Sequence, residues 1–285
     1  MKLLKFVLVV ALMLLVTPQA MALKYTIDGN LSDWGVDLSG NWSLNDTWVP
    51  NDGVKFIVED NSNGEGVHIQ GEGSNYTAFE EPPVQLYTGT WTYEPIGGEM
   101  YDVEAMYLDE DEYYIYIAIV TSVKPGGNPL PGDLALNLDG NETTGGYGFE
   151  YGIRLNPDYI SAKQWHIYKT LTDNNWLIPT DVPMNRPGLL NEANPGTDIG
   201  TVDGDYNQTV NDNGKPNWVI EMAIPKDKIG MTGKNLPDEP LPKLIHHTDA
   251  CGNDHIDFPI PEFLAIIIPA AMISFVAYVR NRIKK

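Results

Sequence analysis

The sequence predicts a mainly β fold, and three observations support this prediction. Short runs rich in Tyr, Ile and Val alternate with polar residues, a pattern that favours strands with one buried face. The 27 glycines and 21 prolines among 285 residues supply many turns between such runs. Roughly ten runs of this kind, together with one short helical turn, fit a β-sandwich of jelly-roll type.

The expected elements follow in order along the chain. The clearest are residues 113–120, where Tyr, Ile and Val dominate, and residues 101–108, where apolar side chains alternate. The acidic run 109–112 between them predicts a hairpin loop, and residues 225–230 predict the helical turn. The other expected strands are residues 54–58, 134–138, 149–155, 165–171, 218–224, 244–248 and 255–258, whereas residues 60–100 and 179–217 predict irregular segments.

Composition excludes several classes of protein. The 39 acidic residues outnumber the 18 basic ones, which gives a formal net charge of −21. Nucleic-acid binding is not expected, because phosphates are bound by a surplus of Lys and Arg on one face. The single cysteine excludes an intrachain disulfide framework and a Cys-rich zinc site.

The N-terminus has the pattern of a secretory signal peptide. Lys2 and Lys5 flank the start of the apolar run 6–16, and Ala20-Met21-Ala22 follows as a small-residue cleavage signature. The run is too short to span a hydrocarbon core of about 30 Å. We therefore expect residues 1–22 to be removed, with an uncleaved N-terminal anchor as the alternative.

The C-terminus predicts a membrane anchor over residues 259–285. Residues 263–279 carry no charge, and four of the last six residues are basic. Such a segment has the minimum length for a transmembrane helix, and its basic tail stays in the cytoplasm by the positive-inside rule. The remaining body, residues 23–258, is then an ectodomain on the outside of the cell.

The order of Pro261-Glu262-Phe263, an apolar span and a basic cluster resembles the PEF-CTERM sorting signal of archaeal surface proteins. The resemblance implies recognition by an archaeosortase, which cuts near the motif and transfers the protein to an anchor. It also implies a cell-surface location at the cytoplasmic membrane of an archaeon. The alternative is a plain C-terminal anchor that is never cut.

Several segments of the ectodomain resemble the family 9 carbohydrate-binding module and its DOMON-like relatives, which are β-sandwiches. The first of these segments contains the sequence Asp-Gly-Asn-Leu-Ser-Asp-Trp, which is similar to the opening of such domains. The resemblance implies a ligand-binding or adhesive domain, with a polysaccharide or cell-envelope glycan as its partner. The matching segments are residues 27–34, 101–105, 114–118, 132–139, 219–225 and 247–254.

Two groups of residues are candidate metal ligands. Asp133, Asn137, Asp139 and Asn141 offer hard oxygen ligands that suit calcium, which members of the resembled superfamily often carry. The alternative for the Asp139-Gly140 step is an Asx-type turn. In the second group, with the spacing His247-x₃-Cys251-x₃-His255, three side chains could serve as ligands of zinc or copper. However, residues four apart on a strand lie about 13 Å from each other. The alternative for this second group is a buried structural cysteine with histidines on the surface.

Aromatic residues predict sugar binding, and sequons predict attached glycans. Flat aromatic rings stack on sugar rings, although core packing is the alternative for each of them. The candidates for binding are Trp91, Tyr93, Trp165 and Trp176. Asparagines in N-x-Ser/Thr sequons predict a glycosylated surface, and they are Asn30, Asn41, Asn45, Asn75, Asn141 and Asn207.

No catalytic motif stands out, so we expect a binding or envelope-structural protein and not an enzyme. Two other classes stay open. DOMON-like relatives include haem-binding electron-transfer domains, for which Met106, Met222 and either His166 or His68 would be the axial ligands. A glycosidase-associated surface protein is the third class, although carboxylate pairs are so frequent in this acidic chain that no catalytic pair can be picked out.

Overall fold

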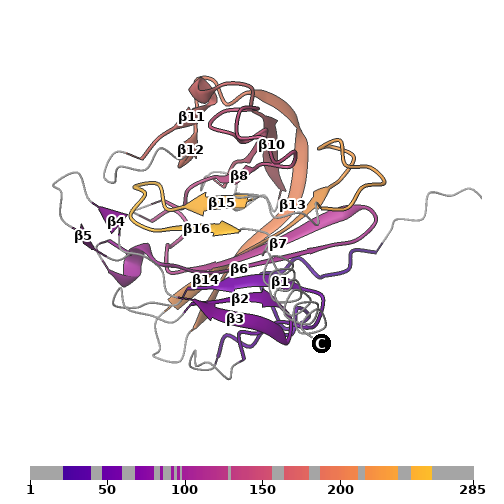
Figure 1. Cartoon of the computed structure of the whole chain (residues 1–285), viewed down its shortest axis with the longest axis vertical. Helices are drawn as coiled ribbons and strands as arrows, with labels where there is room; N and C mark the ends of the chain where they lie inside the picture. Colours follow the sequence, from indigo (N-terminus) through magenta and orange to yellow (C-terminus); the bar gives the residue numbers. More distant parts are fainter. Residues whose placement is uncertain are drawn as a thin grey trace, which may run out of the picture.

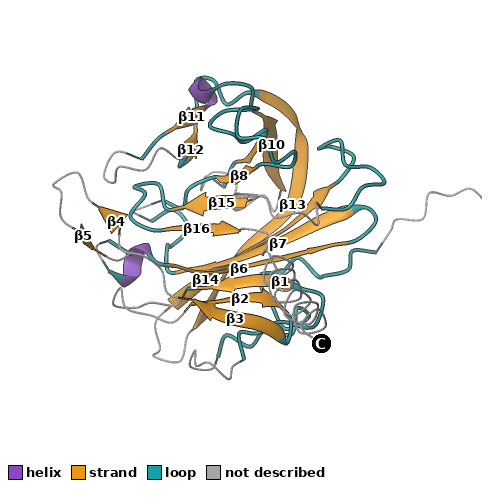
Figure 2. Cartoon of the chain, viewed as in Figure 1, coloured by secondary structure: helices purple, strands orange, loops and turns teal. Residues whose placement is uncertain are grey.

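The computed structural model describes residues 22–39, 47–59, 68–79, 84–85, 91–92, 95–96, 98–127, 130–155, 164–179, 187–210, 216–236 and 245–258. Strands dominate these residues, and the only helices among them are two 3₁₀ turns, η1 (Glu99–Tyr101) and η2 (Asp173–Asn175) (Figure 2). The mainly β prediction is therefore confirmed.

One antiparallel sheet contains twelve of the described strands. Its order is β16-β15-β8-β9-β10-β13-β14-β7-β6-β1-β2-β3. Two short hairpins, β4–β5 and β11–β12, stand outside it. The strands are β1 (Lys55–Val58), β2 (His68–Glu72), β3 (Asn75–Phe79), β4 (Val84–Gln85), β5 (Trp91–Thr92), β6 (Val103–Glu110), β7 (Tyr114–Thr121), β8 (Leu134–Leu136), β9 (Tyr151–Ile153), β10 (Gln164–Lys169), β11 (Trp176–Leu177), β12 (Leu189–Leu190), β13 (Thr197–Val210), β14 (Pro216–Pro225), β15 (Ile245–Thr248) and β16 (His255–Phe258).

The sheet folds over so that its two halves face each other. β13 carries the chain between the halves: its first residues pair with β10 and its last residues pair with β14 (Figure 1). Met106 and Ile117 from one half share a hydrophobic core with Ile153 and Ile167 from the other half. Alternate residues on each strand point into this core, which gives the two-layered, sandwich-like character.

The N-terminal segment covers the outer face of β1, β6, β7 and β14. Trp34 is fully buried there, and its Nε1 donates a hydrogen bond to Glu221 Oε1 at 2.8 Å. Glu221 Oε2 accepts two more hydrogen bonds from the backbone N–H groups of Asp28 and Gly29, at 3.0 and 2.9 Å. One buried carboxylate on β14 therefore holds the whole Asp-Gly…Asp-Trp motif. Trp34 therefore acts as a core anchor that fixes the N-terminal turn.

Gly29 has a specific reason to be glycine. Its φ of +72° lies in the left-handed region, and a Cβ atom there would stand 2.4 Å from the Cβ of Asn207 on β13. The close approach lets the N–H of Gly29 reach Glu221.

The structure corrects three sequence-based expectations. Residues 197–210 form β13, the longest strand, although they lie in a segment expected to be irregular, and β2 and β3 form a hairpin in the other such segment. β6 extends to Glu110, so only the last part of the acidic run is loop. Residues 226–230 form a turn and not a helical turn, because the N–H of Met231 reaches back to the carbonyl of Lys226.

The predicted signal peptide, apart from Ala22, and all of the predicted C-terminal anchor lie outside the described residues. Within the described part of the chain, no helix combines the length and apolar character needed to cross a bilayer.

Glu221 gives the fold a predictable dependence on pH. Burial raises the pKa of Glu221 from an ordinary 4.5 to about 7. The folded state thus favours the protonated carboxyl, which stabilises the protein below about pH 4.5, and this contribution is lost as the pH rises to about 7. The natural protein and Glu221→Gln can be compared by their free energies of unfolding. The difference, natural protein minus variant, should fall by up to about 3 kcal/mol between about pH 4.5 and about pH 7.

Urea unfolding at a series of pH values measures this difference, with the exposed Glu192→Gln as the matched control. The control should show a difference that does not vary with pH. A constant difference for Glu221→Gln would contradict the prediction.

Candidate functional site

A pocket of about 290 Å³ opens where the β6–β7 hairpin meets the end of β14. Exposed and half-buried polar residues line it together with two tyrosines. The described residues that line it are Glu112, Tyr113, Tyr114, Pro225, Lys226, Asp227 and Thr232. We refer to it as the tyrosine pocket.

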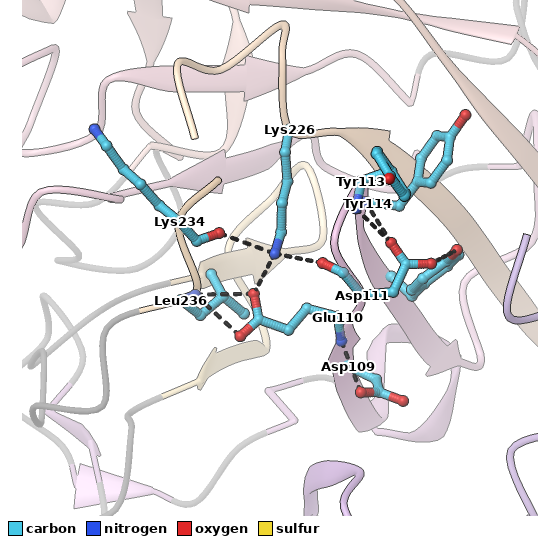
Figure 3. Close-up of polar contacts among 9 residues, drawn as sticks. Asp109, Glu110, Asp111, Tyr113, Tyr114, Lys226, Lys234 and Leu236 are labelled. Atoms are coloured by element: carbon cyan, nitrogen blue, oxygen red, sulfur yellow. Dashed lines mark hydrogen bonds and ion pairs between the residues drawn. The ribbon is translucent and has the colours of Figure 1, made fainter. Parts of the chain in front are cut away.

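Lys226 is the structural centre of this region. Its side chain is only 1 % exposed, and its Nζ lies 2.7 Å from Glu110 Oε2. It also donates hydrogen bonds to the backbone carbonyls of Asp111 at 2.6 Å and Lys234 at 3.0 Å (Figure 3). These three acceptors match the three N–H donors of an ammonium group, so Lys226 is fully satisfied inside the protein.

Glu110 extends the network to a third segment. Both of its carboxylate oxygens accept the backbone N–H of Leu236, at 3.1 and 2.9 Å (Figure 3). The backbone N–H of Lys226 donates to the carbonyl of Tyr113 at 2.8 Å. The end of β6, the hairpin turn and the loop before residue 237 are therefore tied to the end of β14.

Asp111 shapes the turn that carries the two tyrosines. Its Oδ1 accepts the backbone N–H groups of Tyr113 and Tyr114 at 2.7 and 2.8 Å, and its Oδ2 accepts the hydroxyl of Tyr116 at 2.6 Å. Burial opposes ionisation of Asp111, but these hydrogen bonds outweigh it and lower the pKa of the carboxyl. A carboxylate that caps the turn in this way fixes the positions from which both rings extend.

The two rings have different exposures. Tyr113 is 40 % exposed, and a hydrogen bond between its side chain and the Glu112 carboxylate raises the pKa of Tyr113. Tyr114 is half-buried and packs against Tyr116, with ring centroids 5.9 Å apart. Tyr116 in turn meets Tyr25 edge-on at 5.2 Å, so the pocket wall continues into the core.

This arrangement suits a sugar ring. Aromatic faces pack against the apolar C–H faces of sugars, and carboxylates accept hydrogen bonds from their hydroxyl groups. Glu112, Asp227 and Thr232 supply such polar groups beside Tyr113, on loops that are held by Lys226 and Asp111.

The predicted aromatic ligands do not occupy this pocket. Trp165 is fully buried in the large core, where its ring lies against Gly204 of β13, and Trp176 is 3 % exposed in a small outer cluster. Neither ring can stack on a sugar, so the sequence-based expectation for these two residues is corrected. Trp91 lies on β5, and Tyr93 lies outside the described residues.

The four predicted calcium ligands do not form one site. Asp133 and Asn137 flank β8 at its opposite ends. Asp133 is 2 % exposed, and its two carboxylate oxygens accept the backbone N–H groups of Leu155 and Leu190, each at 2.7 Å. Burial raises the pKa of Asp133 to about 6. Asp133 therefore joins loops of the second layer.

Asp139 and Asn141 form the turn that the sequence allowed as the alternative. Asp139 Oδ1 accepts the N–H of Asn141 at 2.8 Å, and Asn141 Oδ1 accepts the N–H of Thr143 at 3.0 Å. The hydroxyl of Thr144 lies between Asp139 and Glu150, at 2.9 and 2.8 Å from their carboxylates. Burial first, and then the nearby Asp139, raise the pKa of Glu150 to about 7.

The histidine and cysteine cluster is also separated by the fold. His247 pairs with Ile256, whereas His255 pairs with Thr248, so the two histidines lie on opposite faces of the β15–β16 hairpin. Burial lowers the pKa of His247 to about 3. Among the described residues, no group of three His, Cys, Asp or Glu side chains is placed to hold a metal ion.

Three of the candidate haem ligands, Met106, Met222 and His166, lie in different surroundings. Met106 and Met222 are fully buried in the large core. His166 is on the other face of β10 from Trp165, and its Nδ1 lies 2.7 Å from the Asp198 carboxylate. These positions give no observation that favours the electron-transfer alternative.

Four sequon asparagines lie in described residues, and all four are exposed: Asn30, Asn75, Asn141 and Asn207. Asn41 and Asn45 lie outside the described residues. A second hollow of about 340 Å³ lies beside Asn30 and Asn207. Its described lining contains no aromatic ring, and Asn207 Nδ2 already donates to the carbonyl of Asp28. The tyrosine pocket is therefore the stronger candidate.

Sequence reasoning assigned Tyr113 and Tyr114 to a strand and Asp227 to a helical turn, and so missed the site. A local signal was present, because the hairpin tip combines an acidic run with two adjacent tyrosines. The contribution of Lys226 had no such signal, since its acceptors come from distant segments.

We found no protein family, curated protein or solved structure that matches this chain. The functional argument therefore depends on the residues of the chain itself.

Replacement of Lys226 tests its structural role. Lys226→Met leaves Glu110 and two carbonyls without their donor, and breaking such a buried pair costs roughly 3–5 kcal/mol. We expect the lower end of this range, because the Glu110 side chain is 24 % exposed. Denaturant unfolding measures the loss.

Lys234→Met is the matched control, because Lys234 contributes only its backbone carbonyl to the network. It should unfold within about 0.5 kcal/mol of the natural protein, as surface substitutions do. Equal losses in both variants would contradict the assigned role of Lys226.

Proposed function

We propose that this chain is a surface protein of an archaeon that binds a glycan through the tyrosine pocket. The single observation that carries the binding part is the pocket itself. It brings Tyr113 and Tyr114 together with Glu112, Asp227 and Thr232 in one lining. The resemblance to the family 9 carbohydrate-binding module and its jelly-roll-like sandwich belongs to the same proposal.

The ends of the chain support the location. The signal peptide over residues 1–22 would direct export, and Pro261, Glu262 and Phe263 would be recognised by an archaeosortase before anchoring at the membrane. The net charge of −21 and the exposed sequon asparagines suit a body that faces the medium. A polysaccharide or envelope glycan outside the cell would then be within reach of the pocket.

A preformed site favours binding at low entropic cost. The turn that carries Tyr113 is fixed by Asp111, and the neighbouring strand end is fixed by Lys226. Ordering a loop on binding would otherwise reduce the affinity. The proposal is therefore for binding and display without turnover.

The pocket can be tested with Tyr113→Ala. We expect the affinity for the bound glycan to fall at least about tenfold, because a buried aromatic contact is worth about 1.4 kcal/mol or more. A glycan array identifies the ligand, and calorimetry measures its affinity.

Leu171→Ala is the control, because Leu171 is an exposed apolar residue outside the pocket. It should bind as the natural protein does. Undiminished binding by Tyr113→Ala would place the ligand elsewhere, and a lack of binding to every glycan on the array would refute the binding function.

The sorting segment makes a separate prediction. Replacing Pro261, Glu262 and Phe263 together by alanine should leave the basic tail attached, because the recognition motif is lost. Mass spectrometry of the membrane fraction from the native host measures the tail, and an impermeant label on intact cells reports exposure of the body. Pro259→Ala is the control and should be processed normally. A natural protein that keeps its tail, or a body never reached by the label, would contradict the proposed route.

A further inference from the structure

The charge that the tyrosine pocket presents to a ligand is negative. Glu112 and Asp227 are both exposed in its lining. Lys226 is the one basic residue among the described lining residues, and its ammonium is 1 % exposed and paired with Glu110. Lys226 therefore cannot bind an anionic group of a ligand.

The nearby lysine does not alter this balance. The Lys234 side chain is absent from the described lining, and it extends away from Tyr113 and Tyr114 (Figure 3). The chain as a whole carries a net charge of −21, which adds a long-range field of the same sign. A uronate, sulfate or phosphate group on a glycan would be repelled.

The tyrosine rings favour a ligand group with a positive charge. An ammonium group within about 6 Å of an aromatic ring face is attracted by the ring quadrupole. Glu112 and Tyr113 are consecutive in the chain, both are exposed and both line the pocket, so an acidic and an aromatic residue belong to one wall. A cation seated there would contact both.

From these contacts we infer that the tyrosine pocket prefers a glycan with a free, protonated amino group, as in an unacetylated amino sugar. This inference rests on the proposed glycan-binding function. The ring stacks on the sugar face, and Glu112 and Asp227 neutralise the ammonium. Acetylation of the amine would remove the charge and the preference.

Calorimetry near pH 6 tests the inference, because the amine of the glucosamine probe is largely protonated there. The probes are tetramers of glucosamine, N-acetylglucosamine and glucose. We expect the glucosamine tetramer to bind at least about tenfold more tightly than the other two, an advantage that shrinks between about 0.02 M and about 0.2 M salt. Glu112→Gln and Asp227→Asn should each weaken the binding of the glucosamine tetramer more than that of the two uncharged tetramers, and so remove most of this advantage.

Glu192→Gln, which removes an exposed carboxylate outside the pocket, should keep the full advantage. Equal affinity for the three tetramers, with binding still lost in Tyr113→Ala, would overturn the amine preference and leave the glycan-binding function standing. Glucosamine binding that survives Tyr113→Ala would show unspecific attraction to an acidic protein and would also overturn the inference. No binding of any tetramer or array glycan would refute the glycan-binding function itself.

Discussion

The buried ammonium of Lys226 is the constraint on which the candidate site depends. A charge removed from water must be paired and hydrogen-bonded, or it destabilises the fold by several kcal/mol. Here the acceptors come from two separate segments, the consecutive residues Glu110 and Asp111 and the backbone of Lys234. Apolar side chains can often replace both members of a buried ion pair without loss of stability. We therefore assign Lys226 mainly a role in fixing geometry and a smaller role in net stability. It holds the hairpin tip against the end of β14.

A second buried side chain, Glu221 on β14, lies five residues before Lys226 and has a different structural role. The carboxylate of Glu221 binds Trp34 and the backbone around Gly29, and so attaches the N-terminal segment to the outer face of the sheet. Tyr25 stacks on Trp34 at 4.1 Å and meets Tyr116 at 5.2 Å. This continuous aromatic packing reaches the tyrosine pocket from the side opposite to Lys226. One central strand thus supports the pocket through a buried acid and a buried base.

Local patterns predicted the strands well where apolar residues alternate, and residues 255–258 form a strand with the expected bounds. They failed for β13, since its Asp, Gly and Asn residues normally mark loops. Gly204 is required there because the ring of Trp165, on a neighbouring strand, leaves no room for a Cβ atom. The site was hidden for the same reason: Lys226 and its acceptor Asp111 are 115 positions apart, and only the fold brings them together.

In the proposed function, a glycan would contact Tyr113 and its neighbours on a β body that would face the medium. The most direct measurement is an NMR titration of the ectodomain body, residues 23–258, with the glucosamine tetramer, in which amide shifts map the contact. The account predicts saturable shifts concentrated at residues 111–114 and 225–232. Saturable shifts centred instead on the hollow beside Asn30 and Asn207, or shifts spread evenly over the acidic surface, would contradict it.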